Sequence, residues 1–99
     1  MHARVNILDG PPDKIDEGIT YFRERILPEL KHTNGFRGTI SLHDRQNGRT
    51  LGITFWEGEE AIGATEEGAN QRRGEVAEAS GGASADAEIY EVGFFDIDG

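Results

Sequence analysis

The 99-residue chain contains no cysteine, which excludes disulfide bonds and thiolate-ligated metal sites. No apolar run approaches the roughly 20 residues that a membrane-spanning helix needs. The first four residues, Met-His-Ala-Arg, lack the apolar stretch of a secretory signal. From these absences we expect a soluble, cytoplasmic protein with no membrane partner.

Basic residues are also scarce, since 10 Lys and Arg stand against 19 Asp and Glu, for a net charge of −9. The imbalance is confined to residues 57–99, which hold 2 basic and 12 acidic residues, against 8 and 7 in residues 1–56. Such a field repels nucleic acid and anionic lipid, so neither is an expected partner. The acidic half is interpreted as a solvated face that keeps the protein soluble, with a basic docking partner or a salt-rich cytoplasm as alternatives.

The length predicts one domain, residues 1–99, because a chain of 99 residues builds a single core. Apolar and polar residues alternate over 3–8, 36–45, 50–56 and 87–97, which predicts four strands. Asn47-Gly48 lies between the second and third of these and is typical of a tight hairpin turn.

Two helices are predicted between the strands. The first has one apolar stripe with helical spacing, and Pro28 should kink or end it; the stripe is Ile15, Ile19, Phe22, Ile26 and Leu30. The second, over 58–79, carries four glycines and should be broken or loosely packed. Residues 80–86 are expected to form a flexible loop. The order β-α-β-β-α-β predicts an α+β, ferredoxin-like fold, with two helices on one face of a four-stranded antiparallel sheet.

The two faces of the predicted sheet differ in character. One is apolar and holds Val5, Ile7, Ile40, Leu42, Ile53, Phe55, Tyr90 and Val92. The other is mixed and holds Arg4, Asn6, Leu8, Thr39, Ser41, His43, Thr54, Trp56, Ile89 and Phe95. The mixed face is too apolar for bare solvent and too polar for a dry core. A dimer of facing sheets, with a semi-polar cavity in each subunit, would meet both demands.

Several segments in this order resemble a known family: Asn6 on the first strand, then "ILPEL", "GFRG", the Asn-Gly hairpin, "ITFWEGEEA" and "YEV". Over nearly its whole length the chain is similar to the antibiotic-biosynthesis-monooxygenase (ABM)-type domain of the dimeric α/β-barrel superfamily. The resemblance implies a homodimer whose two sheets form a barrel, and a small-molecule cleft between sheet and helices. It also implies that the mixed face lies under the helices.

The family includes cofactor-independent oxygenases of phenols and quinols as well as haem-degrading oxygenases. In the haem-degrading branch, a first-strand asparagine and a tryptophan after the third strand work with a histidine on the second helix. Asn6 and Trp56 match the first two, but no histidine lies within 57–79. We therefore expect no haem, no metal site and no other cofactor.

The candidate catalytic residues are Asn6, Trp56 and His43, and the candidate ligand-binding residues are Thr54, Arg72, Tyr90 and Phe22. Each has a structural alternative. Trp56 could seal the core, Asn6 could bond backbone or water, and Tyr90 could be a core residue. His43 could be a general base or an idle, exposed side chain.

The cations of the acidic half are Arg72 and Arg73, of which one could hold an anionic substrate. The alternative is a pair with a helix carboxylate such as Glu66 or Glu75.

These residues suggest a small monooxygenase-like protein that acts on an aromatic or quinol-type molecule without a bound metal. The alternative is a non-catalytic, small-molecule-binding or stress-associated protein on the same scaffold. A third possibility is an interaction module that uses its acidic half.

Overall fold

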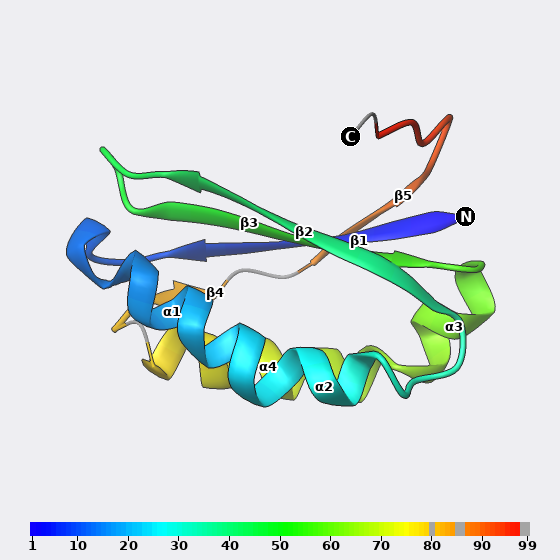
Figure 1. Cartoon of the computed structure of the whole chain (residues 1–99), viewed down its shortest axis with the longest axis horizontal. Coiled ribbons are helices and arrows are strands. Elements are labelled where there is room, and N and C mark those ends of the chain that lie inside the picture. The colour runs from blue at the N-terminus through cyan, green and yellow to red at the C-terminus, as the bar shows by residue number, and fades with distance from the viewer. Residues whose placement is uncertain (80, 85–86, 98–99) are drawn as a thin grey trace.

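The computed structural model describes residues 1–79, 81–84 and 87–97. An antiparallel sheet forms one layer, and helices cover one of its faces (Figure 1). The strands are β1 (His2–Asp9), β2 (Phe36–Asp44), β3 (Arg49–Trp56), β4 (Ala83–Ser84) and β5 (Glu88–Glu91). The helices are α1 (Ile15–Tyr21), α2 (Leu27–Leu30), α3 (Glu59–Ala64) and α4 (Glu66–Ala79), with a 3-10 turn (Pro12–Lys14) and a π-helical segment (Phe22–Ile26).

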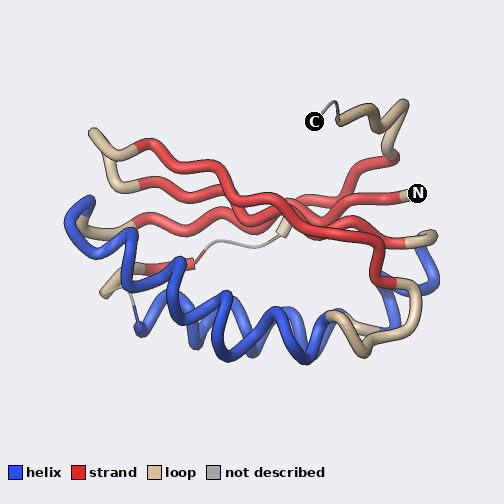
Figure 2. Tube along the Cα trace, viewed as in Figure 1, coloured by secondary structure: helices blue, strands red, loops and turns tan. Residues whose placement is uncertain are grey.

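The strand order is β2-β3-β1, and β4 and β5 follow one another along the free edge of β1. The sheet is therefore four strands wide, and all of its pairs are antiparallel. In Figure 2 the strands form one layer, and the helices form a second layer against one face of it. The predicted ferredoxin-like fold is confirmed. Among the described residues no helix is both long enough and apolar enough to cross a membrane.

The end of the chain departs from the predicted strand over 87–97. The strand ends at Glu91, and residues 83–84, expected in a loop, instead pair with β1 as β4. The rest of that predicted loop includes residues 80, 85 and 86, which lie outside the described part. Beyond β5, the Phe95 ring packs edge-on against Phe55, with 5.0 Å between centroids. Phe95 therefore lies on the apolar face of the sheet, not on the mixed face as expected.

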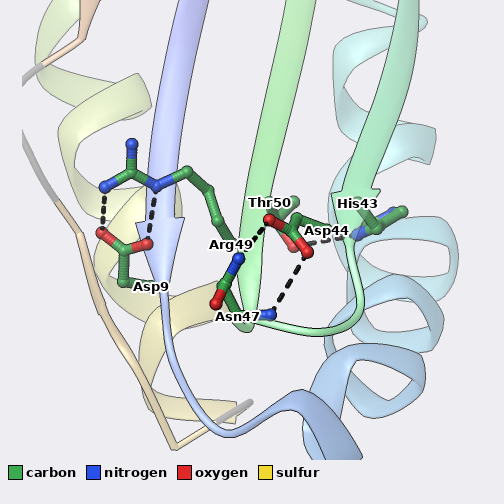
Figure 3. Close-up of polar contacts among 6 residues, drawn as sticks. All are labelled: Asp9, His43, Asp44, Asn47, Arg49 and Thr50. Carbon is green, nitrogen blue, oxygen red and sulfur yellow. Dashed lines mark hydrogen bonds and ion pairs between the residues drawn. The ribbon is translucent and has the colours of Figure 1, made fainter.

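The predicted Asn-Gly hairpin is present between β2 and β3. The Asp44 carboxylate accepts hydrogen bonds from the Asn47 backbone and side chain at 3.2 and 2.8 Å (Figure 3). Gly48 takes a φ of 76°, and the Gly10 N–H donates to its carbonyl at 2.9 Å. A Cβ on Gly48 would lie only 1.8 Å from the Gly10 carbonyl oxygen. The hairpin turn is thus tied to the end of β1 at a point that only glycine fits.

The first helical region is continuous from α1 to α2 but widens before Pro28. Proline has no N–H, so the helix ladder loses a donor at that position. One residue earlier, the Leu27 N–H bonds the Phe22 carbonyl, five residues back rather than four. This π-helical turn keeps Phe22 and Ile26 on the side that faces the sheet.

The second helical region is broken, as its glycines predicted. Thr65 separates α3 from α4, and its hydroxyl donates back to the Ala61 carbonyl at 2.8 Å. The hydrophobic core lies between this region, the first helix and the end of β3, and consists of Ile26, Leu30, Trp56 and Ile62. The helices therefore cover the mixed face, as the family resemblance implied.

Candidate functional site

A pocket of about 90 Å³ lies between the mixed face of the sheet and the helices. Its roof is apolar except for two arginines of α4: Ile15, Ile19 and Phe22 contribute from the first helix, and Ala69 and Val76 from α4. Polar groups come mainly from the sheet beneath. An apolar enclosure with a few convergent polar groups is the usual make-up of a small-molecule site.

Directly paired residues on neighbouring strands share a face of the sheet. The floor of the pocket therefore consists of rows of three residues, one each from β2, β3 and β1. One row is His43, Thr50 and Leu8; the next is Ser41, Gly52 and Asn6; the third is Thr39, Thr54 and Arg4. Successive rows are roughly 7 Å apart along the strands.

Gly52 occupies the middle of the second row, and a Cβ there would meet nothing nearer than Asn6 Cβ at 4.0 Å. The missing side chain leaves the hollow between Asn6 and Ser41, both of which line the pocket. Sequence reasoning overlooked Gly52. The available signal was a glycine within a strand pattern, which often marks a close approach of ligand or backbone.

Asn6 is held by two groups from different elements. Its Nδ2 donates to the Gly52 carbonyl at 2.8 Å, and its Oδ1 accepts from Arg73 Nη1 at 3.0 Å. The backbone partner is the structural alternative considered from sequence. An asparagine amide carries two N–H donors, so one remains after the Gly52 bond. That donor is the group Asn6 can offer a ligand.

Trp56 seals the core and stands behind the wall of the pocket, with no ring face exposed for a ligand to stack on. Its side chain is fully buried in the core cluster, and the pocket lies next to it. The indole Nε1–H donates to Thr54 Oγ1 at 2.9 Å, so Thr54 orients the ring. Phe36 packs edge-on against the indole at 5.5 Å, and the Arg4 guanidinium lies 5.6 Å from its centroid.

His43 lines the hairpin end of the pocket and is half-buried. Its Nδ1 lies 2.8 Å from Thr50 Oγ1 (Figure 3), and its Nε2 lies 2.8 Å from Ser41 Oγ. Burial lowers the pKa of His43 below its ordinary value of 6.5, and the nearby Arg45 charge lowers it further, while Asp16 opposes the shift. The imidazole is therefore neutral at pH 7 and can accept a proton.

Three arginines line the pocket: Arg4 from β1, and Arg72 and Arg73 from α4. The pairing of Arg72 or Arg73 with Glu66 or Glu75, left open from sequence, is not among the ion pairs of the described residues. Sequence reasoning did not propose Arg4 as a site residue. Its signal was a charge in the middle of an otherwise apolar strand, on the same face as Asn6.

Of the residues predicted to bind ligand, Thr54, Arg72 and Phe22 line this pocket, and Tyr90 does not. Tyr90 pairs with Ala3 and lies on the opposite, apolar face, with 53% of its surface exposed. The alternation of the strand had already placed Tyr90 on this apolar face, so its assignment to a pocket on the mixed face was wrong.

The residues do not fit a haem held in the manner of the haem-degrading branch. Helices α3 and α4 contain no histidine. His43 stands at the hairpin end on β2, with both ring nitrogens bonded to hydroxyls. His2 faces Glu59 at 3.3 Å and is not among the residues lining the pocket.

Solved structures share this arrangement over nearly the whole chain. The haem-degrader MhuD of Mycobacterium tuberculosis superposes with a TM-score of 0.71 at 22% identity, covering 99% of this chain and 100% of that one. The ActVA-Orf6 monooxygenase of Streptomyces coelicolor, solved with nanaomycin D, gives 0.67 at 16% identity and covers 99% and 91%. A dimeric ferredoxin-like protein from an uncultured marine organism gives 0.66 at 9% and covers 98% of both chains.

The chain shares the ferredoxin-like fold of these structures, which include monooxygenases. At these identities the likeness establishes the fold and leaves the family and the reaction open. No family model matches the sequence. The protein Rv2557 of M. tuberculosis H37Rv, whose function is uncharacterized, is 34% identical over 92 residues, which cover 93% of this chain. The chain spans 41% of the length of that relative.

Proposed function

We propose that the protein is a small, cofactor-independent monooxygenase that acts on an aromatic or quinol-type molecule. The observation that carries this proposal is that Asn6 on β1 and His43 on β2, two strands and one row apart, both line the floor of one apolar pocket. The monooxygenase activity of a structural neighbour, ActVA-Orf6, supports the reaction type. The volume of about 90 Å³ is well below the 300–1,000 Å³ usual for ligand sites and favours a single-ring substrate.

The reaction needs a substrate that supplies its own electrons. Loss of the phenolic proton gives an electron-rich phenolate that can reduce dioxygen. A ring C–H is then replaced by C=O, and the phenol becomes a quinone. The second oxygen atom leaves as water with the two hydrogens that the substrate loses. The protein has only to accept the proton, orient the oxygen and exclude water.

The polar residues of the floor suit these tasks. His43 is neutral at pH 7 and can take the phenolic proton through the hydroxyl of Ser41, which lines the pocket and lies 2.8 Å from Nε2. The free N–H of Asn6 can donate to a substrate or peroxide oxygen. Phe22 and Ile19 offer apolar surface against which a flat ring can pack.

The test is oxygen consumption with a panel of monocyclic phenols and dihydroxybenzenes. We expect His43→Gln and Asn6→Ala each to lower kcat about a hundredfold. Asn34→Ala, at an exposed turn, is the matched control and should leave kcat unchanged. Because His43 acts as a base, the rate should fall as pH drops through a pKa below 6.5 and stay level above it. Equal rates for Asn6→Ala and the parent protein would remove the site assignment.

A non-catalytic binding role is the second candidate. It is favoured because both His43 nitrogens are engaged by hydroxyls, which leaves no side-chain base in direct reach of a ligand. Phenols that raise the melting temperature without any oxygen uptake would support this role over the monooxygenase.

The assembly we propose is a homodimer, in which the apolar faces of two sheets pack together. That face carries exposed apolar side chains, including Leu42 at 48% and Tyr90 at 53%, and Phe94 beyond β5 is 88% exposed. Apolar exposure of this extent is typical of an interface. A structural neighbour is described as dimeric, which supports the same assembly.

A further inference from the structure

Arg4 is a charged residue inside the core. Only 2% of its side chain is exposed, and its Nη2 donates to the Ile62 carbonyl at 2.7 Å and to Thr65 Oγ1 at 3.3 Å. Both acceptors are neutral. The Trp56 ring face adds a modest cation-π attraction. These contacts hold the guanidinium through Nη2 without neutralising its charge.

Two further guanidinium groups lie near Arg4. Arg73 and Arg72 both line the pocket from α4, and their charges, added to burial, lower the pKa of Arg4 to about 10. Glu66 opposes the shift, but its effect is the smallest of the four causes. The pocket therefore gathers three positive charges in a molecule whose net charge is −9.

None of the three forms an ion pair with a carboxylate of the described residues. Arg73 bonds the amide oxygens of Asn6 and Asn70, and its buried Nε has no hydrogen-bond partner among the described residues. Burial lowers the pKa of Arg72, while Glu29 and Glu75 act on it only at longer range. Buried charges are normally paired, because an unpaired charge is costly to desolvate.

We propose that the ligand of this pocket carries a carboxylate, which supplies the missing negative charge beside Arg72, Arg73 and Arg4. The ligand class is a small aromatic acid with a ring hydroxyl. Its carboxylate lies toward the arginines, and its ring lies over Gly52, against Phe22. This inference rests on the proposed function, since it names the substrate class of the same pocket. An uncharged phenol would leave the three guanidinium groups without a counter-charge.

The test compares hydroxybenzoates with the matching hydroxybenzamides, which have nearly the same shape and no charge. Binding to the full chain is followed by the fluorescence of Trp56, the single tryptophan, and checked by calorimetry. We expect each acid to bind at least about tenfold more tightly than its amide, because charge-assisted hydrogen bonds are stronger than neutral ones. The preference should weaken as salt is added.

Variants assign the preference to residues. Arg72→Gln and Arg73→Gln should each reduce the ratio of acid to amide affinity, and the double variant should bring it near one. Arg23→Gln, an exposed arginine of the π-helical segment, is the matched control and should keep the parent ratio. Arg73→Lys retains the charge and should keep part of the preference. Arg4 is left intact, because its bond to the Ile62 carbonyl ties β1 to α3.

Equal affinity for acids and amides would overturn the inference, and so would an acid preference that survives in the double variant. Failure of every acid to bind would also do so. Oxygen uptake, recorded in parallel, separates this inference from the proposed function. If acids bind without oxygen uptake, the carboxylate inference stands and the monooxygenase proposal fails. If neutral phenols are oxidised with the same kcat/KM as the acids, the monooxygenase proposal stands and the carboxylate inference fails.

Discussion

The indole of Trp56 joins the core to the pocket. It is fully buried, yet its N–H does not reach a distant polar group; it bonds Thr54, two residues back on the same face of β3. This local bond allows a polar ring to stand at the junction of strand and helix without an unsatisfied donor. The orientation of the pocket wall is therefore set within one strand.

The first prediction concerns that bond. Thr54→Val keeps the side-chain shape but removes the acceptor, so the buried indole N–H loses its partner. We expect the free energy of unfolding to fall by about 1–3 kcal/mol, the usual cost of a buried unsatisfied donor. Urea unfolding measures the change. Thr20→Val, at an exposed position of α1, is the control and should change it by less than about 0.5 kcal/mol. Equal losses in both variants would contradict the role of Thr54.

Arg4 marks the limit of prediction at the residue scale. Its position on the mixed face follows from strand alternation. Its hydrogen-bond partners, however, are 58 and 61 residues away in sequence, on α3 and in the break before α4. Strand alternation predicts on which face of the sheet a residue lies, but it does not predict which helix packs against that residue. The burial of Arg4, and the gathering of Arg72 and Arg73 beside it, became visible only once the helices were placed.

At the scale of elements, periodicity predicted β1 to β3 and the first helix within a residue or two, because long amphipathic patterns are strong signals. The π-helical segment was not predicted, since its signal is a single missing N–H at Pro28. The last strand was overextended because Phe94 and Phe95 continue the alternation beyond the point where the chain leaves the sheet. Phe95 turns back onto Phe55 instead.

Two glycines in different elements give a paired prediction. Gly48→Ala places a Cβ 1.8 Å from the Gly10 carbonyl at a φ of 76°, so it should destabilise the protein by at least about 2 kcal/mol. Gly74→Ala, inside α4, meets nothing within 4 Å and should stabilise it by about 0.5–1 kcal/mol. Thermal and urea unfolding check both signs. A neutral Gly48→Ala would mean that the hairpin does not close on β1 in this way.

At the scale of the whole molecule, one face of the sheet is covered by helices (Figure 1), and the other exposes apolar side chains. If that second face is the dimer interface, a charge placed on it should separate the subunits. We expect Leu42→Lys to convert a dimer into a monomer in sedimentation experiments at micromolar concentration, because the interface would have to bury an unpaired lysine from each subunit. Thr20→Lys, on the helical side, should leave the dimer intact. A monomeric parent protein would refute the proposed assembly.

The separation of charge between surface and interior has a kinetic consequence. An anionic ligand that approaches the molecule is first repelled by its net charge of −9 and is attracted by the guanidinium groups only inside the pocket. At 0.1 M ionic strength, mobile ions screen exposed charges beyond about 10 Å but reach enclosed ones far less. Added salt should therefore raise the association rate of an anionic ligand. It should also shorten the residence time of the bound ligand, because the attraction inside the pocket becomes weaker.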